Sequence, residues 1–324
     1  MPELTAAVLI ATYNRPVNLR ICLEHLAIQT VTPVQTIVVD SSPDSRSEIV
    51  AQEFGVTYLR NPMGRGHTAT SRMLGVAVAG DADVIAFIDD DAYAEPEWLE
   101  QLLVRYSDPI VGGVGGRARN GQPDEERVGV DAIGKFLRDG TLTGNFAADP
   151  GRDVPVDHFL GANMSLRLSA VHAVGGIQDY YPGTCLREES EIALRLRLAR
   201  YRLLFTPDAC VEHVAGTYAK GRRFDARYSY YGQRNHIVLL ARVLGSRDPR
   251  FHRYLRVALG QLCEEVAYTG RALGRSRVIG QESIVSGVGR GLTRSVSTAA
   301  GIAVGLGLVL LRRIPRAAIG TTTP

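Results

Sequence analysis

Residues 84–91 read VIAFIDDD, an apolar run that ends abruptly in three aspartates. A short run rich in β-branched and aromatic side chains, bounded by polar residues, predicts a strand that is buried on both faces. The change to carboxylates marks the place where the chain leaves the core. The segment therefore predicts a central strand that delivers acidic side chains to one edge of a sheet.

The chain before this segment alternates between strand-like and helix-like stretches. Short apolar runs predict strands at residues 6–11, 35–39 and 56–59. The spacing of apolar residues predicts helices at residues 16–26, 48–54 and 70–79. Such an alternation forms a mainly parallel sheet with helices on both faces, and ligands bind at the carboxyl ends of its strands. Polar clusters follow three of the strands, at residues 12–14, 40–42 and 89–91.

The chain after this segment is less regular. It has a glycine-rich strand at residues 111–116 and a polar, loop-rich stretch at 117–155. Helices are predicted at residues 168–174, 189–199 and 228–244, and a strand from residue 201 runs through Pro207 to His213. From Phe251 onward the pattern is helical. The predicted fold class is therefore α/β with a helical C-terminal extension.

The acidic turn of Asp89, Asp90 and Asp91 has two interpretations. Packed carboxylates repel one another, so a divalent cation is a natural partner for them. The alternative is a solvated turn or a helix cap before Pro96, because acidic turns are common. HAD-type phosphatases also place a D-x-D motif after a strand, so the motif does not by itself identify the reaction.

Two further segments carry residues suited to catalysis. Glu188, Glu189 and Glu191 open a predicted helix, where acids either favour the helix dipole or include a general base for a hydroxyl group. His213 follows a strand and is either a structural hydrogen-bonding residue or a ligand that completes the aspartate site. Mixed oxygen and nitrogen ligation of this kind is compatible with Mn²⁺ or Mg²⁺.

Nine short segments occur in an order that is more specific than any one of them. They read ATYNRP, VVDSS, NPMGRGHTATSR, FIDDD, GGVGG, GANMSLR, EESEIALRLR, PDACVEH and YYGQRN. In this order the chain resembles the family 2 glycosyltransferases, especially bacterial rhamnosyl- and galactofuranosyltransferase-like members. The resemblance runs from about residue 6 to residue 244. It implies the GT-A fold, a Rossmann-like, mainly parallel mixed sheet with helices on both faces.

The resemblance also implies roles for single residues. Those implied to bind the nucleotide sugar are Thr12, Tyr13, Asn14, Arg15, Asp40, Arg72, Asp89 and Asp90. Those implied to bind a divalent metal, Mn²⁺ or Mg²⁺, are Asp89, Asp91 and His213. The loop of Gly161, Ala162 and Asn163 resembles the acceptor side of the site. The family usually has Arg-Asn where this chain has Arg72-Met73, so a contact of that asparagine is absent or supplied elsewhere.

The family pattern Glu-Asp-x-Asp/Glu is Glu188-Glu189-Ser190-Glu191 in this chain. Glu189 stands where the catalytic aspartate of the family is normally found, so the resemblance implies that Glu189 is the base. Its side chain is longer than that of aspartate by one methylene. Glu188 and Glu191 are the alternatives.

The implied reaction is an inverting, metal-dependent transfer of a sugar from a nucleotide diphosphate, UDP- or dTDP-linked, to a hydroxyl group. The acceptor is a glycan, a lipid-linked molecule or a small molecule. One alternative is a HAD-like phosphatase, which would need Thr where the chain has Tyr93. Another is a non-catalytic sugar-nucleotide-binding or scaffold protein. The acids and histidine retained at Asp89, Asp91, Glu189 and His213 argue against it.

The C-terminal region has a different charge from the rest of the chain. The whole chain carries a net charge of +3, but residues 242–324 hold thirteen arginines against four acids. We expect a GT-A domain at residues 1–244, with a nucleotide-binding part at about 1–116 and an acceptor part at about 117–244. A basic helical region follows at 245–324.

Residues 299–311 form the apolar run AAGIAVGLGLVLL between arginines, and residues 290–316 make up the candidate membrane contact. Thirteen helical residues cover about 20 Å, less than the hydrocarbon core of about 30 Å. The run is therefore expected to lie in a membrane interface, with its arginines at anionic headgroups. The alternative is a buried helix or a contact between subunits.

The four cysteines, Cys22, Cys185, Cys210 and Cys263, form no C-x-x-C pair, which favours a reducing compartment. No signal-peptide pattern is found at the N-terminus. A cytoplasmic protein is expected, peripheral on the inner face of the plasma membrane if residues 290–316 bind lipid. Nothing in the charge pattern indicates a nucleic-acid partner.

Overall fold

The computed structural model describes residues 4–214, 226–274 and 284–318. Its central feature is a mixed sheet with the strand order β3-β2-β1-β4-β8-β6-β9-β5, and β7 pairs with β9 beside this path. The strands are β1 (Ala6–Thr12), β2 (Gln35–Asp40), β3 (Thr57–Arg60), β4 (Val84–Asp89), β5 (Ala92–Ala94), β6 (Val111–Arg119), β7 (Val154–Pro155), β8 (Asn163–Arg167) and β9 (Arg202–His213).

The first four strands are parallel, so their carboxyl ends share one edge of the sheet. β8, a strand that the sequence pattern did not reveal, then runs antiparallel between β4 and β6. The polar clusters that follow β1, β2 and β4 therefore meet at one edge, as predicted.

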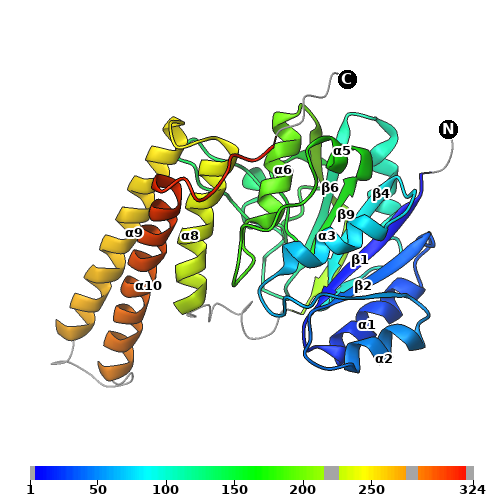
Figure 1. Cartoon of the computed structure of the whole chain (residues 1–324), viewed down its shortest axis with the longest axis horizontal. Coiled ribbons are helices and arrows are strands. Elements are labelled where there is room, and N and C mark those ends of the chain that lie inside the picture. The colour runs from blue at the N-terminus through cyan, green and yellow to red at the C-terminus, as the bar shows by residue number, and fades with distance from the viewer. Residues whose placement is uncertain (1–3, 215–225, 275–283, 319–324) are drawn as a thin grey trace.

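Helices cover both faces of the sheet (Figure 1). They are α1 (Pro16–Ala27), α2 (Arg46–Glu53), α3 (Thr68–Val78), α4 (Trp98–Leu103), α5 (Leu168–Ala173) and α6 (Glu188–Leu198), with short 3-10 turns η1 (Val104–Ser107) and η2 (Val130–Ala132). Alternate residues of β1 pack on opposite faces of the sheet, because successive side chains of a strand point in opposite directions. Val8 packs in the cluster that contains α1, whereas Leu9 packs in the cluster that contains α6. The α/β prediction is confirmed.

The glycines of strand β6 leave room for the side chain of Phe159 to pack directly on the backbone. A Cβ at Gly113 or Gly115 would come within 2.8 Å or 2.7 Å of the ring of Phe159. β6 pairs in parallel with β9, and the register shifts after Gly116, opposite the stretch that contains Pro207. Since proline has no N–H to donate, it fits at an irregularity of the ladder. β9 thus continues past Pro207 and carries His213 to the edge of the sheet.

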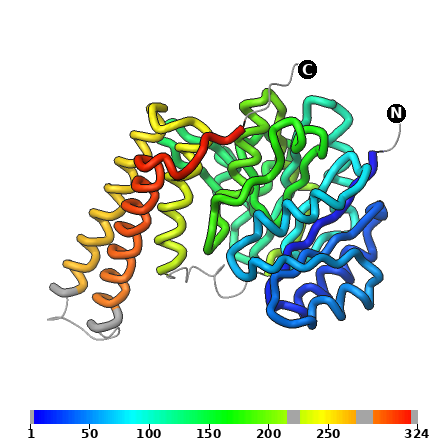
Figure 2. The backbone as a smooth tube through the Cα atoms, in the orientation of Figure 1, coloured from blue at the N-terminus to red at the C-terminus, as the bar shows by residue number. Residues whose placement is uncertain are grey.

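The C-terminal part of the chain adds three long helices, α8 (Ala226–Val243), α9 (Pro249–Gly274) and α10 (Ile284–Leu310). Figure 2 shows α9 and α10 standing out from the sheet as an antiparallel hairpin beside α8. The helix that holds the apolar run is longer than the run itself. By length and composition, Gly287–Leu310 could cross a membrane, a test that the core helix of a soluble protein also passes.

Candidate functional site

A cleft of about 670 Å³ opens at the carboxyl ends of β1 and β4. Most of the predicted site residues line it together. These are Thr12, Tyr13, Asn14, Arg15, Arg72, Asp89, Asp90, Asp91, Gly161, Ala162, Glu188, Glu189 and His213. They come from the ends of β1, β4 and β9, from the loops beside these ends, from α3 and from the first turn of α6.

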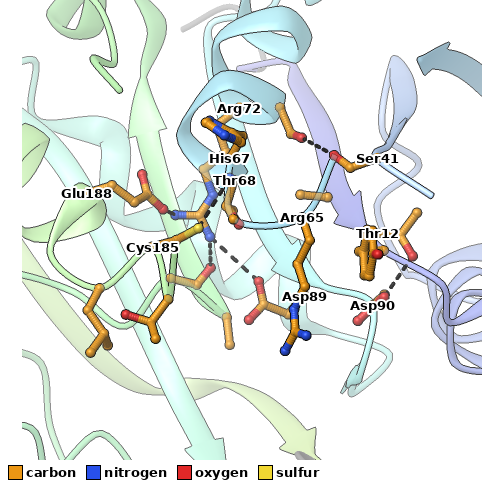
Figure 3. A pocket seen from close by; sticks show the side chains of 18 of the residues that line it. Thr12, Ser41, Arg65, His67, Thr68, Arg72, Asp89, Asp90, Cys185 and Glu188 are labelled. Carbon is orange, nitrogen blue, oxygen red and sulfur yellow. Dashed lines mark hydrogen bonds and ion pairs between the residues drawn. The ribbon is translucent and has the colours of Figure 1, made fainter. Parts of the chain in front are cut away.

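Asp90 is held in place by Thr12, the last residue of β1, and by Arg15, which follows the strand. Its Oδ2 accepts a hydrogen bond from Oγ1 of Thr12 at 2.7 Å (Figure 3), and its Oδ1 accepts one from Nη1 of Arg15 at 3.0 Å. The same guanidinium nitrogen lies 2.6 Å from Oδ2 of Asp91. Burial raises the pKa of Asp90 to about 7 against the opposing charge of Arg15. The first strand therefore orients the acidic turn.

Asp89, Asp91 and His213 form a cluster that can hold a metal ion. One ligand atom from each lies within 4.8 Å of the others. His213 reaches the turn because β5 pairs with β9 and places Ala92 opposite His213. Burial raises the pKa of Asp91, but the hydrogen bond with His213 and the charge of Arg15 outweigh it and leave this pKa below its usual value. Two carboxylates and an imidazole are ligand groups that can hold a divalent cation.

Arg72, a buried residue of α3, joins three parts of the site (Figure 3). Its Nη2 donates to the carbonyl oxygen of Gly161 at 2.8 Å and lies 3.6 Å from Oδ1 of Asp89, and its Nη1 pairs with Glu188. Burial raises the pKa of Glu188 to about 8, against the opposing charge of Arg72. Arg72 thus links the acidic turn, the loop before β8 and the start of α6.

Glu189 follows Glu188 on α6 and differs from it in its surroundings. It lines the cleft and is half-buried, and its Oε1 accepts a long hydrogen bond of 3.4 Å from Ser190. Burial raises the pKa of its carboxyl group above the usual value. Both glutamates line the cleft, and Glu188 is the one that forms an ion pair with Arg72.

Three predicted site residues point into the protein. Glu191 lies between α6 and α8, where its Oε2 accepts from Nε of Arg242 at 2.8 Å. Asn163 accepts from Nε1 of Trp98 at 2.8 Å. Asp40 is fully buried and accepts hydrogen bonds from residues that include Tyr58 at 3.0 Å. The structure places these three side chains behind the walls of the cleft, where they hold the surrounding segments.

Other residues that line the cleft had not been chosen from the sequence. Arg65 and His67 lie in the loop before α3, Thr68 begins α3, and Cys185 lies in the loop before α6, and these two loops meet at the cleft (Figure 3). The backbone N–H of Thr68 lies 3.4 Å from Sγ of Cys185. The NPMGRGHTATSR motif pointed to the first loop, but Arg72 was the only residue of this motif that was assigned a role in the site. No local pattern pointed to the second loop.

The comparisons with known proteins agree with this geometry. The sequence model described as Glycosyl transferase family 2 matches residues 7–171, which include β1, β4 and the acidic turn. The chain belongs to glycosyltransferase family 2. Glu189 and His213 lie beyond the matched residues, and the pairing of β5 with β9 and the position of α6 bring them to the same cleft.

Several curated glycosyltransferases are similar to this family 2 chain. A pre-mycofactocin glycosyltransferase from Mycobacterium tuberculosis is 28% identical over 208 residues, 63% of this chain and 42% of that protein. An O-antigen chain rhamnosyltransferase from Salmonella typhimurium is 25% identical over 208 residues, 63% of this chain and 65% of that protein. The chain thus spans less than two thirds of the length of these relatives.

Two solved structures share the fold. A mannosyltransferase from Pyrobaculum calidifontis, in complex with GDP-Man and Mn²⁺, matches with a TM-score of 0.60 and 16% identity, over 93% of this chain and 86% of that one. GalNAc-T7, with UDP, GalNAc and Mn²⁺, matches with a TM-score of 0.58 and 12% identity, over 96% of this chain and 57% of that one. The resemblance to the GT-A fold is confirmed.

Proposed function

We propose that this glycosyltransferase transfers a sugar from a nucleotide diphosphate to a hydroxyl group with the help of a divalent metal and with inversion at the anomeric carbon. One observation carries the proposal: the metal-capable cluster of Asp89, Asp91 and His213 lines the same cleft as Glu189. The first group suits a diphosphate and the second suits an acceptor hydroxyl. A sugar transfer needs one group for the leaving diphosphate and one for the acceptor hydroxyl, so the presence of both in one cleft supports the proposal.

The donor is proposed to bind along the edge formed by β1 and β4. Asp89, Asp91 and His213 would hold Mn²⁺ or Mg²⁺, which supplies positive charge for the diphosphate leaving group. The nucleotide side would be lined by Thr12, Tyr13, Asn14 and Arg15. The buried Asp40 would support these residues from the interior of the protein. The nucleotide ligands of the two solved neighbours support a nucleotide-sugar donor, and we take UDP or dTDP as its carrier.

Glu189 is proposed to act as the general base. Its carboxylate accepts the proton of the acceptor hydroxyl, whose oxygen forms a bond to the anomeric carbon as the bond to the diphosphate oxygen breaks. A single displacement of this kind inverts the configuration. A base is most effective when its pKa lies near the working pH, so the raised pKa of Glu189 supports this role.

The acceptor side is proposed to include Gly161 and Ala162, whose loop is held by Arg72. Its substrate is a hydroxyl group on a glycan, a lipid-linked molecule or a small molecule. Residues 1–244 would form the catalytic domain, with the nucleotide part at about 1–116 and the acceptor part at about 117–244. The free cysteines of the chain support a reducing cytoplasm as the place of the reaction.

A thermal-shift screen of UDP-, dTDP- and GDP-sugars, each with and without Mn²⁺, tests the proposal. A ligand that binds the native state raises the unfolding temperature by mass action. We expect at least one donor to do so, and to do so more strongly with Mn²⁺. The NMR spectrum of the product then gives its anomeric configuration. No shift with any donor, or a retained configuration, would contradict the proposal.

A further inference from the structure

The outer face of α10 is apolar and exposed over most of the helix. Leu292 is 53% exposed, Val296 66% and Leu310 78%. No charged residue occurs between Arg294 and Arg312. Only 22% of the most apolar 18-residue stretch of this helix is buried. Large exposed apolar faces of this kind mark contact surfaces.

The packing of the inner face of α10 against α8 and α9 determines which of its residues lie on the outer face. Small residues let the helix approach its neighbours closely, since a Cβ at Gly291 would clash with Thr269 of α9 and one at Gly301 with the carbonyl oxygen of Tyr230 of α8. The inner face is thus occupied along its length. Rotation of α10 to bury its apolar residues would break both contacts.

The helix hairpin of α9 and α10, with the residues after it, carries further exposed apolar side chains and an excess of exposed arginines over acids. On α9, Leu259 is 52% exposed and Val266 55%. The exposed arginines of the same region are Arg253, Arg256, Arg271, Arg312, Arg313 and Arg316. The arginines expected to flank the apolar run, Arg290 and Arg294, are instead half-buried and interact with other groups. The charge around the face therefore comes largely from α9 and from the residues after α10.

We propose that the α9–α10 hairpin docks on an anionic lipid surface. The apolar face of α10 enters the boundary between headgroups and acyl chains, and the arginines around it contact the headgroups. Charge complementarity favours this occupant over a second copy of the chain, because two surfaces as basic as residues 242–324 repel each other. Docking does not depend on the catalytic cleft.

The hairpin is better suited to lie on a membrane than to span it. α10 packs against α9, which carries exposed charges at Arg256, Glu264 and Arg271, spread over most of its length. A span would bring these charges into hydrocarbon, where they are costly. An interfacial position leaves them in water. In Figure 1 the end of α9 and the start of α10 point to the same, lower side of the molecule as the carboxyl ends of β1 and β4.

Co-sedimentation of the full chain with vesicles tests this proposal. We expect binding to vesicles of phosphatidylcholine mixed with phosphatidylglycerol, little binding to phosphatidylcholine alone, and weaker binding as salt rises. The double variant Leu292→Asn/Val296→Asn should bind at least about tenfold more weakly, because it removes exposed apolar area and charge alone gives weak attachment. The matched control, Val34→Asn/Ile49→Asn, alters side chains that are 60% and 52% exposed on the sheet domain and should bind as the unmodified protein does.

Two further measurements separate loss of vesicle binding from loss of fold and from changes in the cleft. Unchanged unfolding temperatures in both variants exclude loss of fold, and donor-induced thermal shifts report on the cleft separately. Equal vesicle binding by both variants, or none by the unmodified protein, would overturn the proposal. A dimer that the Leu292→Asn/Val296→Asn variant abolishes, without vesicle binding, would assign the face to a second copy. Resistance to extraction by high salt and alkaline carbonate would instead indicate a span.

Discussion

Nε2 of His213 lies 3.5 Å from Oδ1 of Asp91. The two residues are far apart in the chain, and the antiparallel pairing of β5 with β9 brings them together. The same carboxylate accepts a hydrogen bond from Arg15, a residue that follows the first strand. Asp91 therefore connects the first strand, the acidic turn and the end of β9.

The substitution Asp91→Ala is expected to abolish the Mn²⁺ dependence of donor binding and to leave the fold intact. The side chain lies on a turn at the edge of the sheet, so its loss removes a ligand and creates no cavity in the core. Calorimetric titration of the donor, with and without Mn²⁺, measures the effect. Donor affinity that still responds to Mn²⁺ as in the unmodified protein would exclude Asp91 as a metal ligand.

The substitution Glu189→Gln is expected to preserve donor binding and to lower turnover by about 10²–10⁴, because the amide keeps the shape of the side chain and removes the base. Steady-state kinetics on a donor found by the thermal-shift screen measures it.

The neighbouring glutamates are the controls for this prediction. Glu188→Gln removes the partner of Arg72, so we expect weaker donor binding in addition to any change in turnover. Glu191→Gln leaves Arg242 buried without its ion pair, so we expect a loss of stability of about 3–5 kcal/mol. If either variant keeps its fold and donor affinity and loses more turnover than Glu189→Gln, the base is misassigned.

Turnover at saturating donor is expected to rise with pH through an acid limb above the ordinary glutamate pKa of about 4.3. Burial raises the pKa of Glu189, so the proton stays on this carboxyl group to a higher pH, and only the ionised form accepts a proton from the acceptor. The pH profile of kcat measures the limb. Because Glu188 also titrates, with a pKa of about 8, the profile is repeated in Glu188→Gln. A limb that vanishes in that variant belongs to Glu188.

The substitution Gly301→Ala is expected to destabilise the protein by about 1–3 kcal/mol, because the added methyl group would meet the backbone of Tyr230 and push α10 away from α8. Gly307→Ala is the matched control on the same helix, since a Cβ there has no neighbour within 4 Å. It should leave stability unchanged or raise it by up to about 1 kcal/mol. Chemical unfolding of both variants measures the difference. Equal stability of the two would show that α10 does not pack closely on α8.

Much of the fold was predictable because it depends on local patterns. An apolar run followed by acids identifies β4, and the alternation with helices identifies a parallel sheet whose strand ends share one edge. β8 was missed, since NMSLR is too short to show a clear period. A helical pattern was predicted from Phe251 onward, but the bounds of α10 were not, because glycine, serine and arginine before the apolar run weaken the pattern of a helix that α8 and α9 stabilise by packing.

The sequence by itself determined the parallel sheet, the acidic turn at its edge and the family, because these follow from the order of short apolar and polar segments. Only the tertiary structure decided which side chains share the cleft. It placed His213 beside Asp91 through strand pairing and separated Glu189, in the cleft, from Glu191, in the α6–α8 interface. Glu189 and Glu191 differ only in the direction that each takes around one helix. The packing of α6 between the sheet and α8 decides which direction leads to the cleft and which leads to the interface.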